Sequence, residues 1–227
     1  MSGSAEIAPG VYLVGGPNIS RAEDATAFVI RFPDSLVMID SGCGRSTGIL
    51  ERNMGEAGLD PGGISLLILT HCHIDHVGGA PYFREIHGAR LAMHALDADA
   101  VEQGDPVRTA AHWYDMEFPP TPVDLRFTGS HEVLPFGGEE LHVLHTPGHT
   151  PGSVSLYLDR GGKRILFGQD VHGPFLPAFG SNLDDWRVSM EKLLDLKADI
   201  LCEGHFGIFP DREKVERYLR KYLREYS

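Results

Sequence analysis

The stretch Thr70-His71-Cys72-His73-Ile74-Asp75-His76 decides the fold prediction for this chain. It follows an unbroken apolar run, Ile64 to Leu69, and it precedes the pair Gly78-Gly79. That order is typical of a buried strand that ends in a loop and then opens a helix. Functional residues of layered α/β proteins commonly lie on such loops. Because most side chains of the stretch can bind or orient a metal ion, we ask which other residues complete a metal site.

The spacing within this loop predicts two metal positions. Two histidines two positions apart in an extended segment point the same way, so His71 and His73 are expected to share one ion. Asp75 and His76 then face a second ion. Three imidazoles and one aspartate within six residues would repel one another and would be costly to bury without a cation.

Three further loops, each predicted to end a strand, carry His149, Asp170 and His205. Imidazole and carboxylate ligands together suit Zn²⁺, Fe or Mn. Seven ligands exceed the four positions of a tetrahedral zinc ion, so we expect two Zn²⁺ ions, with Fe or Mn as alternatives. We assign the ligands as follows: His71, His73 and His149 to the first ion, Asp75, His76 and His205 to the second, and Asp170 as a bridge between them. Six other histidines are interpreted as structural or solvated: His87, His94, His112, His131, His142 and His145.

The composition of the chain narrows the classes of protein. The 227 residues are 42% apolar, and we expect a single domain over 1–227. The N-terminus lacks a signal-peptide pattern and no apolar run is long enough to span a bilayer, so a cytoplasmic protein is expected. Three widely spaced cysteines, Cys43, Cys72 and Cys202, argue against a disulfide framework. A net charge of −12 disfavours nucleic acid and anionic membranes as partners.

The flanking sequence predicts an alternation of strands and helices. Strands are expected at 11–16, 25–32, 35–40, 64–69, 90–94, 140–145, 153–159, 164–167 and 199–202. Helices are expected at 46–58, 77–87, 95–103, 183–196 and 211–226. The proline-rich remainder of 95–132 is predicted to be an irregular excursion, of the kind that often forms a lid or a binding loop.

Four motifs resemble those of the metallo-β-lactamase-fold hydrolases, in the glyoxalase II-like and lactonase-like branch: THCHIDHVGG at 70–79, TPGHTPGS at 146–153, GQD at 168–170 and EGH at 203–205. The resemblance implies an α/β fold, a four-layer αββα sandwich of two mixed β-sheets flanked by helices. It places the metals at one edge between the sheets. It also implies that Asp40 supports the metal ligands by hydrogen bonding, with a plain turn cap as the alternative.

The resemblance also narrows the chemistry. Subclass B3 metallo-β-lactamases lack the bridging aspartate, so Asp170 argues against a dedicated antibiotic hydrolase. The chain has no room for the inserted domain of the nucleases, and His73 stands where flavodiiron proteins carry glutamate. Few residues follow Pro210, which leaves little room for the glutathione-binding domain of glyoxalase II. The function implied is attack of a metal-bridging hydroxide on a thioester, ester or lactone carbonyl. The alternatives are a mononuclear iron persulfide dioxygenase that uses His71, His149 and Asp170, and promiscuous β-lactam hydrolysis.

Two residues are assigned catalytic roles. Asp75 is expected to steer the hydroxide or carry a proton to the leaving group. His172, near the place of the lactonase tyrosine, is expected to stabilise an oxyanion, with a solvated loop histidine as the alternative. Apolar walls favour a small-molecule substrate with an acyl or apolar group, and are expected from these residues: Trp113, Tyr114, Met116, Phe118, Phe175, Leu176 and Phe179. Some of them would instead pack on the domain or in a homodimer interface. Cys72 is expected to point into the core without a catalytic role.

Overall fold

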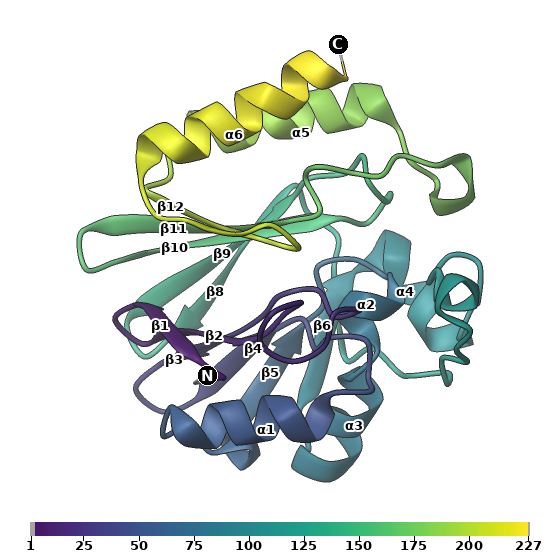
Figure 1. Cartoon of the computed structure of the whole chain (residues 1–227), viewed down its shortest axis with the longest axis vertical. Helices are drawn as coiled ribbons and strands as arrows, with labels where there is room; N and C mark the ends of the chain where they lie inside the picture. Colours follow the sequence, from purple (N-terminus) through teal and green to yellow (C-terminus); the bar gives the residue numbers. More distant parts are fainter. Residues whose placement is uncertain (1–2, 227) are drawn as a thin grey trace.

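A computed structural model describes residues 3–226 as four layers (Figure 1). Two β-sheets lie face to face, α1 and α3 cover the outer face of one, and α5 and α6 cover the outer face of the other. The predicted αββα sandwich is therefore confirmed. No helix in this part of the chain is long and apolar enough to cross a membrane.

The strands of the first sheet are β1 (Ala5–Ala8), β2 (Val11–Gly15), β3 (Ala27–Arg31), β4 (Leu36–Ile39), β5 (Ile64–Ile68), β6 (Arg90–His94) and β7 (Leu125–Phe127), paired in that order. The second sheet holds, from edge to edge, β13 (Gly207–Phe209), β12 (Ile200–Glu203), β11 (Lys163–Gln169), β10 (Val154–Arg160), β9 (Glu139–His145) and β8 (His131–Phe136). The α-helices are α1 (Thr47–Glu56), α2 (Ile74–Val77), α3 (Ala80–His87), α4 (Ala95–Gln103), α5 (Leu183–Asp195) and α6 (Arg212–Glu225). Three short 3₁₀ turns complete the elements: η1 (Pro61–Gly63), η2 (Ala111–Tyr114) and η3 (Pro177–Phe179).

Strand direction sets where the loops meet. Strands β4 to β7 run parallel to one another, and β11 runs parallel to β12. The carboxyl ends of parallel neighbours lie at the same edge of a sheet, which is where ligands bind in layered α/β folds. The loops after β4 and β5 therefore emerge side by side, and so do those after β11 and β12. Strand β9 runs in the same direction as β11, since both are antiparallel to β10, and the loop after β9 carries the motif at 146–153.

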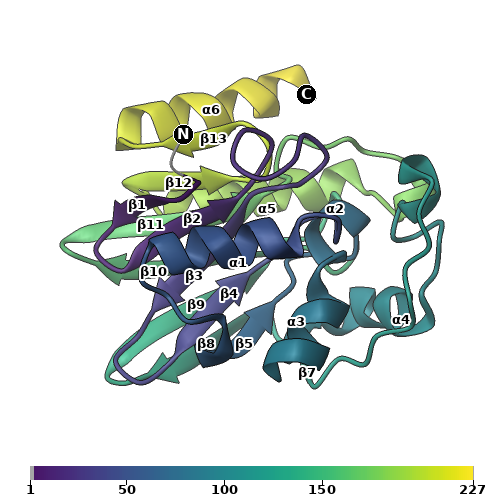
Figure 2. The ribbon, with the colours of Figure 1, turned by 60° about the horizontal axis from the view of Figure 1, so that its bottom comes forward.

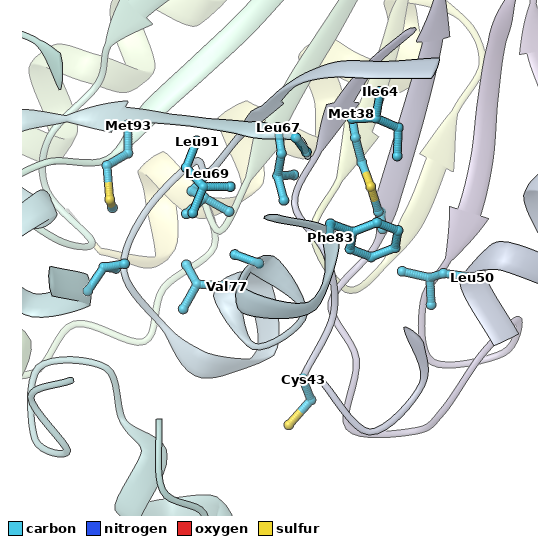
Figure 3. Close-up of a cluster of buried hydrophobic side chains, with 14 of the residues drawn as sticks. Met38, Cys43, Leu50, Ile64, Leu67, Leu69, Val77, Phe83, Leu91 and Met93 are labelled. Atoms are coloured by element: carbon cyan, nitrogen blue, oxygen red, sulfur yellow. The ribbon is translucent and has the colours of Figure 1, made fainter. Parts of the chain in front are cut away.

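Apolar residues fill the three spaces between the four layers. The space between the sheets contains Phe28 and Phe167, whose rings meet edge to face with centroids 5.2 Å apart. Figure 3 shows the cluster beneath α1 and α3, where Leu50 and Phe83 pack near Met38. Because both faces of the central strands are buried, these strands appear in the sequence as continuous apolar runs.

The outer helices begin at side-chain caps. Asn182 accepts hydrogen bonds from the amides of Asp184 and Asp185 at the start of α5, and Asp211 accepts one from Lys214 at the start of α6. The apolar faces of both helices cover the second sheet, while α1 lies across the first sheet in the view of Figure 2.

The structure corrects the predicted helix at 77–87. Helix α2 begins earlier, at Ile74, and ends at Val77, and a second helix, α3, begins at Ala80 after the break at Gly78 and Gly79. An added Cβ at Gly78 would lie 2.3 Å from the carbonyl carbon of Cys43, and one at Gly79 would lie 2.4 Å from the carbonyl oxygen of Ser41. The two glycines therefore permit close approach of the turn after β4, and this packing breaks the helix.

Every predicted strand is present, with ends that differ by at most two residues, but four strands were not predicted. These are β1, β7, β8 and β13, and each is an edge strand of its sheet. Strand β7 lies in the segment predicted to be irregular, and β8 begins at the end of that segment. Edge strands are short or half exposed and lack the apolar run of a central strand, so the pattern does not reveal them.

Candidate metal centre

Seven side chains from the predicted motifs converge at the shared edge of the sheets. They form two groups, and in each group one potential ligand atom from every residue lies within 4.8 Å of the others. The first group contains His71, His73, His149 and Asp170, and the second contains Asp75, His76 and His205. In the described residues 3–226 no other histidine belongs to a group of this kind.

Asp170 lies between the two groups. Its Oδ1 is 3.3 Å from Nε2 of His76 and 3.3 Å from Nε2 of His205. Its Oδ2 is 3.6 Å from Nε2 of His149 and 3.9 Å from Nε2 of His71. One carboxylate thus faces both groups, which is the geometry a bridging ligand requires.

The first group is built from closely spaced ring nitrogens. Nδ1 of His73 is 3.1 Å from Nε2 of His71 and 2.9 Å from Nε2 of His149. Burial lowers the pKa of His71 and of His73 well below the ordinary value, and it lowers the pKa of His149 to about 4. These imidazoles are therefore neutral at pH 7, which is the form that binds a metal.

In the second group the pKa values of the histidines are raised instead of lowered. Burial is the largest single effect and acts to lower the pKa of His76 and of His205, but the neighbouring carboxylates, Asp170 foremost, together outweigh it. The pKa of His76 is well above the ordinary value, and that of His205 rises to about 9. Burial raises the pKa of Asp75. A cation in this place would replace the protons that now balance the carboxylates.

Asp40 fixes the second group from behind. Its carboxylate accepts hydrogen bonds from the amide of Thr70 at 2.8 Å, from the hydroxyl of Thr70 at 2.7 Å and from Nδ1 of His76 at 2.7 Å. The side-chain amide of Gln169 also donates to it. The bond to Nδ1 turns the other ring nitrogen of His76 toward Asp170. Asp40 is therefore more than a turn cap, because it orients a candidate ligand.

Asp97 plays the corresponding part for the first group, and the sequence analysis missed it. This fully buried carboxylate accepts from the amide of Cys72 at 3.1 Å, the hydroxyl of Thr150 at 2.7 Å and the amide of Gly152 at 2.8 Å. It thereby ties the loop of His71 and His73 to the loop of His149. The sequence offered only a weak signal, since an aspartate in the first turn of a helix usually serves the helix itself.

A pocket of about 280 Å³ opens over both groups. Besides candidate ligands, its wall includes Trp113, Tyr114, His172, Phe179 and Phe206. The ring centroid of Phe179 lies 4.2 Å from that of His73 and 4.9 Å from that of Trp113. The apolar side of the pocket therefore adjoins the first group.

Three of the predicted wall residues line this pocket, and four do not. Trp113, Tyr114 and Phe179 do, whereas Met116 and Phe118 pack on the core beneath α3 and α4. Phe175 packs against Trp186 and Tyr226, and Leu176 is half buried away from the pocket. These four are corrected from wall to packing residues, because the core supplies a larger apolar surface than the open pocket does.

The two residues assigned catalytic roles both line the pocket. Asp75 Oδ2 is 3.3 Å from Nε2 of His205. His172 Nδ1 donates to the buried carboxylate of Glu203 at 2.7 Å, which leaves Nε2 as its unengaged ring nitrogen. Cys72 is buried, and its thiol donates to the carbonyl of Arg108, away from the ligand atoms.

Comparison with known proteins identifies the class. Residues 21–205 match the model of the metallo-beta-lactamase superfamily. The chain is 30% identical over 229 residues to acyl-coenzyme A thioesterase MBLAC2 of Gallus gallus, covering 88% of this chain and 78% of the relative. It is 28% identical over 207 residues to the probable metallo-hydrolase YflN of Bacillus subtilis, covering 76% of each.

Solved structures share the fold. A metallo-beta-lactamase of Cronobacter sakazakii, a HARLDQ motif mutant, is 23% identical with a TM-score of 0.81, covering 98% of this chain and 94% of that one. BJP-1, a subclass B3 metallo-beta-lactamase of Bradyrhizobium japonicum, is 22% identical with a TM-score of 0.81, covering 98% and 91%. At this identity the likeness concerns the fold alone. The chain belongs to the metallo-β-lactamase superfamily. It is a metal-dependent hydrolase.

Proposed function

We propose that this protein hydrolyses acyl thioesters with two divalent metal ions held by the seven converging side chains. The observation that carries the proposal is the position of Asp170, whose two oxygens face the two ligand groups. The similarity to an acyl-coenzyme A thioesterase over most of both chains supports the substrate class.

The residues present fit a pair of cations. Nε2 of His76 and Oδ1 of Asp170 are buried, lack a hydrogen-bond partner and lie 3.3 Å apart. Two unsatisfied buried polar atoms that face one point are costly unless a further group completes them. Zn²⁺ suits this mixture of imidazole and carboxylate, and Fe or Mn are the alternatives. When bound, such a pair supplies an activated water and polarises a carbonyl.

Two residues of the chain are assigned the proton transfer and the stabilisation of the carbonyl oxygen. Asp75 accepts a proton from the attacking water, whose oxygen forms a bond to the carbonyl carbon. The carbon–sulfur bond breaks, and Asp75 returns the proton to the departing thiolate, so the products are a carboxylic acid and a thiol. Glu203 holds Nδ1 of His172, and the doubly protonated imidazolium of His172 then donates from Nε2 to the substrate's carbonyl oxygen as that oxygen gains negative charge.

The pocket wall suits the acyl part of the substrate. Trp113 and Phe179 form an aromatic surface beside His73, and Trp113 is 55% exposed, so it is free to cover a bound chain. We also propose that residues 1–227 form one domain, since the two sheets bury a common apolar layer. A homodimer and a cytoplasmic location remain predictions from the sequence.

Metal analysis and a substrate panel test the proposal. Protein purified without added metal is assayed for bound metal, and then for hydrolysis of acyl-coenzyme A thioesters, a lactone and a β-lactam. About two zinc ions per chain and a preference for thioesters are expected. One iron per chain with oxygen uptake on a persulfide would instead favour the dioxygenase, which also needs His71, His149 and Asp170. Inactivity on all three hydrolysis substrates would refute the proposed substrate class.

A further inference from the structure

Tyr114 is a polar group of the pocket that the proposed function does not use. It ends the 3₁₀ turn η2, in the segment that the sequence predicted to be irregular. Its side chain lines the pocket together with Asp75 and Asp170. Burial, and then the charges of these two carboxylates, raise the pKa of its phenol. Among the lining residues in the described part of the chain, Tyr114 supplies the one hydroxyl group.

The backbone around Tyr114 is held in an uncommon conformation. The residues on either side of the turn, Ala110 and Asp115, both adopt left-handed backbone angles, with φ of 56° and 50°. Such angles are unfavourable for alanine and persist only where surrounding contacts impose them. Strained backbone of this kind clusters at functional sites, so we ask whether a residue of this turn takes part in the reaction.

Two contacts fix the turn to the rest of the site. The amide of Ile74, next to Asp75 in the chain, donates to the carbonyl of Thr109 at 2.7 Å. The guanidinium of Arg45 donates to the carbonyl of Tyr114 at 3.4 Å. The backbone that carries Tyr114 is therefore held next to helix α2, which carries two candidate ligands.

The position of the hydroxyl relates it to His172. Tyr114 and His172 line the same pocket as Asp75 and His205. The ring centroid of His172 lies 5.5 Å from that of His205, and Nε2 of His205 lies 3.3 Å from Oδ2 of Asp75. The two residues thus flank the second ligand group. A tyrosine hydroxyl turns about a single bond, so it exchanges an acceptor without movement of the ring.

We propose that Tyr114 is a catalytic residue, whose hydroxyl donates a hydrogen bond to the substrate's carbonyl oxygen in the tetrahedral transition state. The proposal rests on the proposed thioesterase function. A hydroxyl on a half-buried ring that turns only about its own bond can follow the charge that develops on the carbonyl oxygen, so its hydrogen bond is strongest in the transition state. Tyr114 and His172 would together form a two-donor oxyanion site.

The test compares Tyr114→Phe with Tyr82→Phe in the metal-loaded enzyme. Loss of one oxyanion donor lowers kcat by about 100-fold, with KM little changed. Tyr82 is the matched control because it too is a partly buried tyrosine near a carboxylate, with its hydroxyl 3.0 Å from Glu51, but it lies on α3 away from the pocket. The control variant keeps the wild-type kcat. Unchanged kcat in Tyr114→Phe would overturn the proposal.

Two further readouts separate catalysis from support of the metal ligands. Metal content stays at the wild-type level in Tyr114→Phe, whereas loss of metal would show that Tyr114 merely positions Asp75. A monoester of hexylphosphonic acid serves as a tetrahedral probe, and its affinity should fall by about the same factor as kcat. If the wild type hydrolyses no thioester, the proposed function fails, yet binding of the phosphonate still decides the role of Tyr114. Equal affinity in wild type and variant would overturn it.

Discussion

The two ligand groups lie at one sheet edge but differ in charge and exposure. The first consists of three histidines that burial keeps neutral, and the side chain of His149 is 4% exposed. The second pairs histidines with carboxylates, and the side chain of His205 is 27% exposed. One carboxylate, Asp170, faces both. The first group is therefore ready to bind a cation, whereas the second must exchange protons for it.

The supports of the two groups differ in the same way. Asp97 joins two loops through backbone amides and one hydroxyl, so it sets where the first group's loops lie. Asp40 bonds directly to a candidate ligand ring, so it sets how His76 is turned. The first group is therefore organised mainly through the backbone of its loops, and the second through a contact between side chains.

The largest effect is expected from removing the shared carboxylate. Asp170→Asn should lower kcat/KM by about 1,000-fold, because the proposed bridging ligand loses its charge and several kcal/mol of transition-state stabilisation with it. Bound metal should fall from about two ions per chain toward one. Steady-state kinetics and elemental analysis measure both effects. Asp184→Asn is the control, since the Asp184 side chain is 92% exposed. Full activity in Asp170→Asn would show that the two ligand groups do not depend on Asp170.

The supporting carboxylates allow each group to be weakened in turn. Asp40→Asn should reduce the affinity of the second group by about 10- to 100-fold, and Asp97→Asn should do the same to the first. Stepwise titration with Co²⁺, followed by absorption spectroscopy, resolves the two binding steps. Each variant serves as the control for the other. If both variants weaken the same binding step, the assignment of Asp40 to the second group and of Asp97 to the first is wrong.

Low pH should lower the folding stability of the region that supports the first ligand group. His94 caps helix α4, which carries Asp97, and its ring stacks on that of His145 with centroids 3.9 Å apart. Burial lowers the pKa of His94 from 6.5 to about 4, so between these values the unfolded chain binds the extra proton and stability falls as the pH drops. At pH 5 the loss due to His94 is about 2 kcal/mol.

Urea unfolding of metal-free wild type and His94→Phe at pH 7 and pH 5 measures this contribution. The variant lacks the titrating group, so its stability should fall less between the two pH values. An equal pH dependence in both proteins would show that His94 does not contribute.

The smallest effect is expected at the pocket wall. Trp113→Ala should raise KM for a long-chain acyl thioester by about tenfold, with a smaller change for an acetyl thioester, because an aromatic surface that covers the chain is lost. Ile86→Ala is the control, as Ile86 is also an exposed apolar residue, at 61%, and lies on α3 outside the pocket. An equal change in KM for both chain lengths would show that Trp113 does not contact the acyl chain.

Central strands could be predicted from the sequence, and edge strands could not. Strands such as β4 and β5 are buried on both faces, so they appear as apolar runs. Strand β8 is half exposed along its length and contains Pro135, so its residues resemble a loop. Only pairing with β9 makes it a strand.

The sequence by itself determined the candidate metal donors and their order. The reason is local: His71, His73, Asp75 and His76 share one short segment, and each remaining donor lies within a few residues of the end of a predicted strand. Tertiary structure alone decided which of the other polar groups serve the site. Asp97, Tyr114 and the split between wall and packing residues depend on contacts between segments far apart in the chain, and such contacts leave no periodic signal in the sequence.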